Sequence, residues 1–348
     1  MPRRGSVLGV RAALRSARGA EAEGPTRHVA SRRAAASVAP APARAEGAAA
    51  HDGTPAAAPA VVAPRRCRAC AGPGTARFVK RGFVVAACAD CGCHFVPDPV
   101  PAAATYDEAY FAGEGECGYG GYLADREVIL ANFARRARWI ARLAPGKRVL
   151  DVGAAYGFFV AAARAAGFVA SGLEPVPACA AFARRELGVE IVTGCIEDAP
   201  LPAGGFDVIT LFDVIEHLAQ PAVALRRIRA LLAPGGVVVI ETGDLGGLLV
   251  RVVGSSWYYY DPPQHLTYFS LASLEQVLLR TGFSSPVDVG HLGRAVSVRN
   301  FFHQLGRALG GGVLGEASRA VSRSPLATLT FPVPDRGNAF IAAARRRP

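Results

Sequence analysis

The stretch VLDVGAAYGFF, residues 149–159, decides the fold. A short apolar run reaches Asp151, two glycines follow at Gly153 and Gly157, and apolar residues at helical spacing come next. This order is typical of a strand that turns into a helix, because glycines let the backbone of the turn approach a ligand closely. A dinucleotide-binding turn would need the spacing G-x-G-x-x-G to seat a pyrophosphate, and this stretch lacks it. The carboxylate of Asp151 would repel a pyrophosphate and suits a cationic ligand or an amino group.

Strands and helices alternate around this stretch from about residue 123 onward. Apolar runs at 147–153, 168–174, 189–194, 206–212 and 237–242 have the length of buried strands, and helical patterns of about 10 to 15 residues separate most of them. A last strand is expected near the carboxyl end of the chain, within GNAFIAAARR. The pattern predicts an α/β fold with a doubly wound, Rossmann-like parallel sheet whose ligand lies at the carboxyl ends of the strands.

Glu174 ends the second strand of this pattern, 23 residues after Asp151. A carboxylate at this point can accept hydrogen bonds from both ribose hydroxyls of a nucleoside. The expected ligand therefore has a nucleoside and a positive centre but no pyrophosphate. S-adenosylmethionine meets all three conditions.

These residues resemble the first motifs of the class I S-adenosylmethionine-dependent methyltransferases. Asp151, Gly153 and Gly157 match the glycine-rich motif of that family. Ala155 replaces the middle glycine of the usual D-x-G-x-G-x-G, which narrows the loop by one methyl group and leaves cofactor binding in place. Glu174 matches the family's ribose-binding acid.

The resemblance runs from roughly residue 123 to 345. It implies that the adenine ring of the cofactor lies beside Cys195 and Ile196, just after the third strand. It also implies that Phe212 and Asp213, at the end of the fourth strand, border the cofactor. The ordered set of motifs, in register with the strands, is more specific than the first motif alone.

The pairs Glu216-His217 and Gln264-His265 resemble most the small-molecule branch of the family, which includes ubiquinone and natural-product O-methyltransferases. The resemblance implies an enzyme that moves a methyl group to an oxygen or carbon of a small-molecule acceptor. A base is required only where the nucleophile must lose a proton early. His217 is the first candidate, because an unperturbed pKa of about 6.5 suits a base at neutral pH, and His265 is the second. Each could instead have only a local packing role.

Four cysteines between residues 67 and 97 form two Cys-x-x-Cys pairs with 17 residues between them: Cys67 with Cys70, and Cys88 with Cys91. This spacing predicts a zinc ribbon in which four thiolates close the coordination sphere of a structural Zn²⁺. The residues between the pairs predict a strand, a glycine turn and a second strand. Cys93 and His94 are spare donors, either of which could replace Cys91. A set of free thiols or disulfides is disfavoured in a chain with no secretory signal.

The net charge of +11 is concentrated at the ends of the chain. Residues 1–66 hold eleven Arg against four acidic residues, a net +7, and three more Arg stand at 345–347. The remainder is close to neutral, which weakens the hypothesis of a nucleic-acid partner but leaves it open. The Ala, Arg and Pro of residues 1–66 predict a disordered tail or, alternatively, an organelle transit peptide. No apolar run approaches the roughly 18 residues that span a membrane, so the expected location is the cytoplasm.

Three further segments complete the predicted organisation. Residues 98–122 are a linker to a methyltransferase domain at 123–348. YYYDPPQHLTYFS, residues 258–270, should lead into a helix capped by Ser270, its tyrosines either lining the acceptor pocket or forming an interface. Residues 292–335 interrupt the alternation and predict a substrate lid or a homodimer contact. Two other activities stay open, because ribosomal-RNA methyltransferases that contact RNA through a ribbon, and sugar C-methyltransferases, also place a zinc module before this fold.

Overall fold

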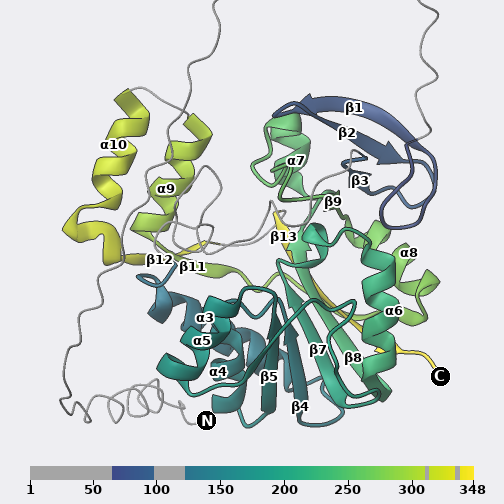
Figure 1. The fold of residues 1–348 in the computed structure, drawn as a ribbon. Coiled ribbons are helices and arrows are strands. Elements are labelled where there is room, and N and C mark those ends of the chain that lie inside the picture. The colour runs from purple at the N-terminus through teal and green to yellow at the C-terminus, as the bar shows by residue number, and fades with distance from the viewer. Residues whose placement is uncertain (1–64, 98–121, 310–312, 334–337) are drawn as a thin grey trace, which may run out of the picture. The chain divides into compact units, whose positions relative to one another are not determined.

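Seven strands form a mixed sheet (Figure 1): β4 (Arg148–Val152), β5 (Val169–Glu174), β6 (Ile191–Thr193), β7 (Phe206–Phe212), β8 (Leu232–Gly243), β10 (Phe283–Gly290) and β13 (Ala339–Arg346). Their order across the sheet is β10-β13-β8-β7-β4-β5-β6. The five strands from β4 to β8 run parallel, which confirms the predicted Rossmann-like α/β fold. β13 is antiparallel to both β8 and β10, so the sheet is mixed at that end rather than parallel throughout.

Helices cover both faces of this sheet, as burial of a parallel sheet requires. On β4, Val149 belongs to one hydrophobic core and Leu150 to the other, and on β7 Val208 and Ile209 alternate in the same way. This alternation follows from the two-residue period of side chains along a strand. The helices on the Val149 face are α3 (Arg126–Ile140), α4 (Phe158–Ala165) and α5 (Pro177–Phe182), and those on the Leu150 face are α6 (Pro221–Leu231) and α8 (Leu271–Arg280).

The amino-terminal cysteine module is built on a small sheet of its own. Its strands β1 (Gly74–Lys80) and β2 (Phe83–Cys88) form the predicted hairpin, joined by a two-residue turn in which Arg81 and Gly82 both have positive φ, at 48° and 81°. Such turns match the right-handed twist of the strands that they connect. We call residues 65–97 the ribbon module.

A strand from the other part of the chain completes the sheet of the ribbon module. The short strand β3 (His94–Phe95) pairs with β2 on one side and with β9 (Thr267–Tyr268) on the other. The pairing continues in the hydrogen bond from the Val96 N–H to the Leu266 carbonyl, at 2.9 Å. The end of the segment 258–270 therefore joins the ribbon sheet, and the described residues from 65 onward belong to one compact unit.

The segment after β10 leaves the central sheet. Strands β11 (Arg294–Ser297) and β12 (Thr330–Val333) pair with each other, and helices α9 (Val298–Leu309) and α10 (Val313–Ser322) lie between them in the chain (Figure 1). The short helix α7 (Leu248–Val253) follows β8. The predicted insertion at 292–335 thus has secondary structure of its own, and its role as a lid or a dimer contact stays a prediction.

The computed structural model describes residues 65–97, 122–309, 313–333 and 338–348. The predicted tail up to residue 64 and nearly all of the predicted linker, residues 98–121, lie outside these ranges. Within these ranges, no helix combines the length and the apolar character needed to cross a membrane.

Candidate active site

The glycine-rich loop after β4 has the conformation that its sequence predicts. Gly153 and Gly157 have φ values of +71° and +80°, which glycine adopts at no steric penalty. Ala155, which stands where the family has a glycine, also has a positive φ of 46°. A left-handed conformation costs about 1–2 kcal/mol for a residue with a Cβ atom. The alanine therefore keeps the shape of the loop at the expense of some local strain.

Glu174, the last residue of β5, holds this loop through its carboxylate. One oxygen accepts a hydrogen bond from the Ala155 N–H at 2.9 Å, and the other accepts one from the Val176 N–H at 3.1 Å. The residue is only 3% exposed, and burial raises the pKa of its carboxyl, although the two backbone donors act in the opposite direction. The predicted ribose acid thus lies at the tip of β5, directly against the predicted cofactor loop.

Asp151 lies on the neighbouring strand β4 and is also buried, at 4% exposure. Thr210 of β7 donates a hydrogen bond to it at 2.7 Å. Burial raises the pKa of Asp151 to about 7, the Thr210 hydrogen bond lowers it, and the nearby charge of Glu174 raises it further. Two carboxyl groups therefore lie close together at one end of the sheet, and a positive charge placed between them would favour ionisation of both.

The other predicted cofactor positions divide into two groups. The turn after β6 lies beside Glu174, because the Gly194 N–H donates to the Glu174 carbonyl at 3.0 Å; in this turn Cys195 is exposed and Ile196 is buried. Phe212 ends β7, but its ring packs edge-on against Phe159 at 4.7 Å, on the α3 and α4 side of the sheet. The structure therefore gives Phe212 a packing role there.

Asp213 belongs to a cluster of acidic side chains that the sequence did not reveal. Its φ is +52°, an uncommon conformation for a residue other than glycine and one that often marks a functional site. The residue as a whole is exposed, yet desolvation by the surrounding protein raises the pKa of its carboxyl to about 7, and the charges of Glu216 and Glu241 raise it further. Burial likewise raises the pKa of Glu216 to about 7. The Tyr259 hydroxyl donates to one oxygen of Glu216 and lies 3.5 Å from Asp213.

A buried ion pair borders this cluster. Arg136 of α3 donates to both carboxylate oxygens of Glu241 of β8, with Nε 2.6 Å from Oε2. The two side chains are 6% and 8% exposed. The bidentate geometry satisfies both carboxylate oxygens, which a buried ion pair requires in order to be tolerated.

The two predicted catalytic histidines lie together, although 47 residues separate them in the sequence. Their ring centroids are 4.6 Å apart. Nδ1 of His217 lies 2.8 Å from the Gln264 carbonyl, and Nδ1 of His265 lies 2.7 Å from the Tyr259 carbonyl. A carbonyl only accepts, so each Nδ1 carries a proton, and when the ring is neutral its lone pair is on Nε2. Burial lowers the pKa of His217, which keeps this ring neutral and able to act as a base.

Glu216 completes a three-residue group with these histidines. A carboxylate oxygen of Glu216 and one ring nitrogen from each of His217 and His265 lie within 4.8 Å of one another. Two imidazoles and a carboxylate can bind a divalent transition metal or can pass a proton among themselves. The structure thus brings together the predicted base candidates and adds the acid beside them.

The three consecutive tyrosines of the segment 258–270 have three different environments. Tyr258 accepts a hydrogen bond from Asn338 at 2.6 Å, Tyr259 reaches Glu216, and the Tyr260 hydroxyl lies 2.7 Å from His94 Nδ1 of the ribbon module. Tyr259 therefore lies at the acidic cluster and Tyr260 at the interface with the ribbon module. The expected cap is present as well, because Ser270 and Ser273 form a capping box at the start of α8.

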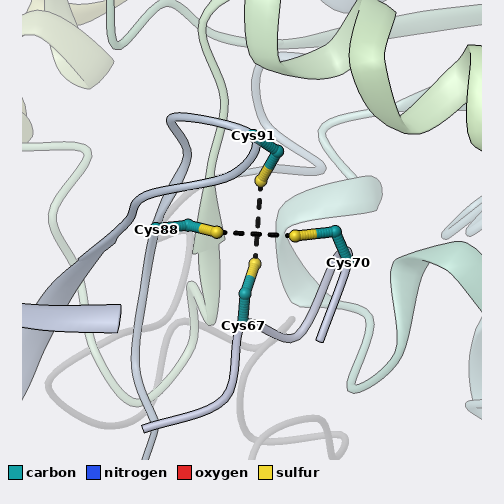
Figure 2. A group of neighbouring side chains, drawn as sticks. All are labelled: Cys67, Cys70, Cys88 and Cys91. Atoms are coloured by element: carbon teal, nitrogen blue, oxygen red, sulfur yellow. Dashed lines mark hydrogen bonds between the residues drawn. The ribbon is translucent and has the colours of Figure 1, made fainter. Parts of the chain in front are cut away.

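The four predicted zinc ligands converge in the ribbon module. Figure 2 shows the sulfur atoms of Cys67, Cys70, Cys88 and Cys91 pointing toward one centre, and all four lie within 4.8 Å of one another. The Cys67–Cys91 and Cys70–Cys88 sulfur separations are 3.8 and 3.4 Å. Tetrahedral zinc with bonds of about 2.3 Å needs sulfur atoms roughly 3.8 Å apart. The donor set therefore fits a Zn²⁺ ion.

The two spare donors of the ribbon module differ in position. The Cys93 sulfur lies 3.3 Å from the sulfurs of both Cys67 and Cys91, so it forms a fifth thiol at the edge of the group. His94 instead contacts Tyr260, and its pKa falls to about 4, first through burial and then through the charge of Arg77. Cys93 thus stays an alternative ligand, whereas His94 belongs to the interface with the segment 258–270.

Comparison with known proteins assigns this arrangement to a family. Residues 123–285 match a family model described as a methyltransferase domain. Over these residues the chain is similar to class I S-adenosylmethionine-dependent methyltransferases. The loop after β4, Asp151 and Glu174 all lie inside the matched residues of this methyltransferase domain.

Individual relatives cover only part of this chain. A ubiquinone biosynthesis O-methyltransferase from Thiobacillus denitrificans is 33% identical over 132 residues, which are 35% of this chain and 57% of that protein. A malonyl-[acyl-carrier protein] O-methyltransferase from Serratia marcescens is 29% identical over 126 residues, 36% of this chain and 49% of that protein. The chain thus spans about half the length of these relatives. Among solved structures, a SAM-dependent methyltransferase from Archaeoglobus fulgidus is 16% identical with a TM-score of 0.44, covering 65% of this chain and all of that one.

Proposed function

We propose that this chain is a methyltransferase that uses S-adenosylmethionine to methylate an oxygen or carbon atom of a small-molecule acceptor. The observation that carries the proposal is the position of Glu174, whose buried carboxylate lies at the tip of β5 and binds the loop after β4. Carboxylates there suit ribose hydroxyls and a cationic centre, whereas a pyrophosphate would be repelled. Two relatives are named as O-methyltransferases, which favours oxygen as the acceptor atom.

The residues of the loop and strand tips fit this cofactor. Glu174 would hold the ribose, Asp151 would lie near the positive end of the ligand, and the turn containing Cys195 and Ile196 would border the adenine ring. When bound, S-adenosylmethionine supplies a methyl group that is already activated by the sulfonium. The chain then needs mainly to bring the acceptor into line with that methyl group, a proximity effect worth several kcal/mol.

The histidine pair gives the acceptor side a base. The Gln264 carbonyl orients His217 and fixes its proton on Nδ1, so Nε2 can take a proton from a phenol, a hydroxyl or an acidic carbon. The same geometry at His265 provides a second position, and Glu216 beside them can stabilise the positive charge that the proton creates. Tyr259 fixes the carboxylate of Glu216 in place.

We propose a structural role for Zn²⁺ in the ribbon module. Four thiolates complete a tetrahedral site and leave no position for water or substrate, so the metal would stabilise the fold of the module. Because β3 pairs with β9, the metal would also stabilise the segment that carries Tyr259 and His265. The nucleic-acid alternative receives no comparable support from the described residues.

Calorimetric titration of the purified full-length chain with S-adenosylmethionine and S-adenosylhomocysteine tests the proposal directly. Saturable binding of both, together with S-adenosylhomocysteine production from pooled phenols, hydroxy acids and sugars, is the expected result. Metal analysis of the same sample should give one zinc per chain. Binding of a nicotinamide or flavin nucleotide with no heat from either sulfur compound would overturn the proposal.

A further inference from the structure

A pocket of about 560 Å³ lies between the ribbon module and the segment that follows β8. Arg77 and Phe78 of β1 line one side of this pocket, and Arg251 of α7 lines the other. His94 and Tyr260, which contact each other, also line this pocket. We call this pocket the cationic groove.

The two arginines are the cationic residues of the lining, and the Asp244 carboxylate accepts a hydrogen bond from the N–H of Gly246, a lining residue, at 2.8 Å. Neither guanidinium has a hydrogen-bond or ion-pair partner within the described part of the chain, and none of the lining residues is Asp or Glu. The neighbouring Arg81, by contrast, is paired with Asp261. The charge of Arg77 reaches the interior of the groove, because it helps to lower the pKa of His94.

Guanidinium groups bind phosphate oxygens through paired N–H donors, and two of them suit a multiply charged oxyanion better than a single carboxylate. The volume of the groove exceeds that of one phosphate group, so a larger phosphorylated molecule can enter it. Aromatic rings form its floor, with the Tyr260 ring 4.9 Å from Phe78 and 6.0 Å from His94. Such a floor suits the apolar or planar part of a ligand next to its charged group.

The groove is also continuous in sequence with the acceptor side of the active site. Tyr260 faces the groove, and the preceding residue, Tyr259, donates a hydrogen bond to Glu216 beside the histidine pair. Both tyrosines belong to a buried aromatic cluster that also holds Trp257 and Tyr268, and the groove borders this cluster. We propose that the cationic groove binds a phosphate or diphosphate group of a small-molecule ligand. This inference goes beyond the proposed function, because none of the groove's lining residues belongs to the proposed cofactor site.

Calorimetric titration with inorganic pyrophosphate, at constant ionic strength, tests the groove without knowledge of the acceptor. The wild-type chain should bind pyrophosphate saturably. Arg77→Gln and Arg251→Gln should each weaken this binding by about tenfold, the loss expected when one charge-assisted paired contact is removed. The matched control is Arg138→Gln, which removes an exposed arginine of α3.

A second titration, with S-adenosylhomocysteine in the presence of saturating pyrophosphate, separates this inference from the proposed function. Unchanged affinity for S-adenosylhomocysteine supports an anion site distinct from the cofactor site, whereas displacement would place the anion in the cofactor site and overturn the inference. Failure to bind S-adenosylhomocysteine at all would instead refute the proposed function. Absence of saturable pyrophosphate binding would overturn the inference. Equal weakening of pyrophosphate binding by Arg138→Gln would overturn it as well. So would an RNA oligonucleotide that binds through Arg77 and Arg251 in place of pyrophosphate, with a steep dependence on salt.

Discussion

Replacement of Glu174 by alanine tests the part of the structure on which the cofactor assignment depends. The change removes the acceptor of two backbone hydrogen bonds, from Ala155 at 2.9 Å and from Val176 at 3.1 Å. A buried donor left without a partner costs about 1–3 kcal/mol. We therefore expect the free energy of unfolding to fall by roughly 2 kcal/mol or more, with the loop after β4 losing its attachment to β5.

The same substitution should weaken cofactor binding by at least tenfold. A hydrogen bond to a charged group contributes about 1.5–3 kcal/mol, so even one lost ribose contact exceeds the 1.4 kcal/mol that corresponds to a tenfold change. Calorimetry gives the dissociation constants for S-adenosylmethionine and S-adenosylhomocysteine, and urea unfolding gives the stability. Glu174→Gln keeps one oxygen acceptor and should lie between alanine and the wild type.

Glu190→Ala is the matched control for these variants. Glu190 lies close to β6 but is exposed, and its ion pair with Arg184 has an N–O distance of 3.8 Å. Exposed pairs of this kind contribute little to stability, so both the stability and the cofactor affinity should stay close to the wild-type values. A folded Glu174→Ala chain with unchanged cofactor affinity would refute the ribose assignment.

Three further predictions concern other parts of the structure. Cys88→Ser should release zinc, measured by metal analysis. Because β9 pairs with β3, the same variant should lower hydrogen-exchange protection at Thr267 and Tyr268 as well as in the ribbon module. Cys93→Ser should retain the zinc, and loss of zinc from this variant would make Cys93 a ligand. The pKa of Asp151 rises from 3.8 to about 7 on folding, so its contribution to stability is complete below about pH 4 and is lost as the pH rises to about 7. In urea unfolding between pH 5 and 8, the free energy of unfolding should therefore decline less for Asp151→Asn than for the wild type, and equal declines would contradict this. Arg136→Met should reduce the free energy of unfolding by about 3–5 kcal/mol because it leaves Glu241 buried without its partner, and Arg136→Met combined with Glu241→Gln should recover part of the loss, which a chemical denaturation series would measure.

Much of the cofactor side could be predicted from the sequence because its signals are local. The acid, the glycines and the helix of residues 149–159 stand next to one another, and the φ values of Gly153 and Gly157 are those that such a turn requires. Glu174 could be found from its place at the end of a strand. The ribbon hairpin was equally local, since its cysteine spacing and the turn at Gly82 lie within one short segment.

The acceptor side could be predicted only in part, because its contacts join distant residues. His217 and His265 were candidates separately, but nothing in the sequence showed that the centroids of their rings lie 4.6 Å apart. The contacts of Tyr259 with the acidic residues Asp213 and Glu216 join parts of the chain more than 40 residues apart. The assignment of Phe212 to the cofactor came from its position at a strand end and stays a prediction; the contact of its ring with Phe159 could not be seen in the sequence.

The pairing of β3 with β9 also has a consequence for folding during synthesis of the chain on the ribosome. His94 and its partner Tyr268 are separated by 174 positions, so at about 5–20 residues per second roughly 10–35 s elapse between their syntheses. All four thiols of the proposed zinc site have been made by residue 91, well before that interval ends. Zinc binding at this site would therefore precede synthesis of β9, and the hairpin would already present the strand with which β9 pairs.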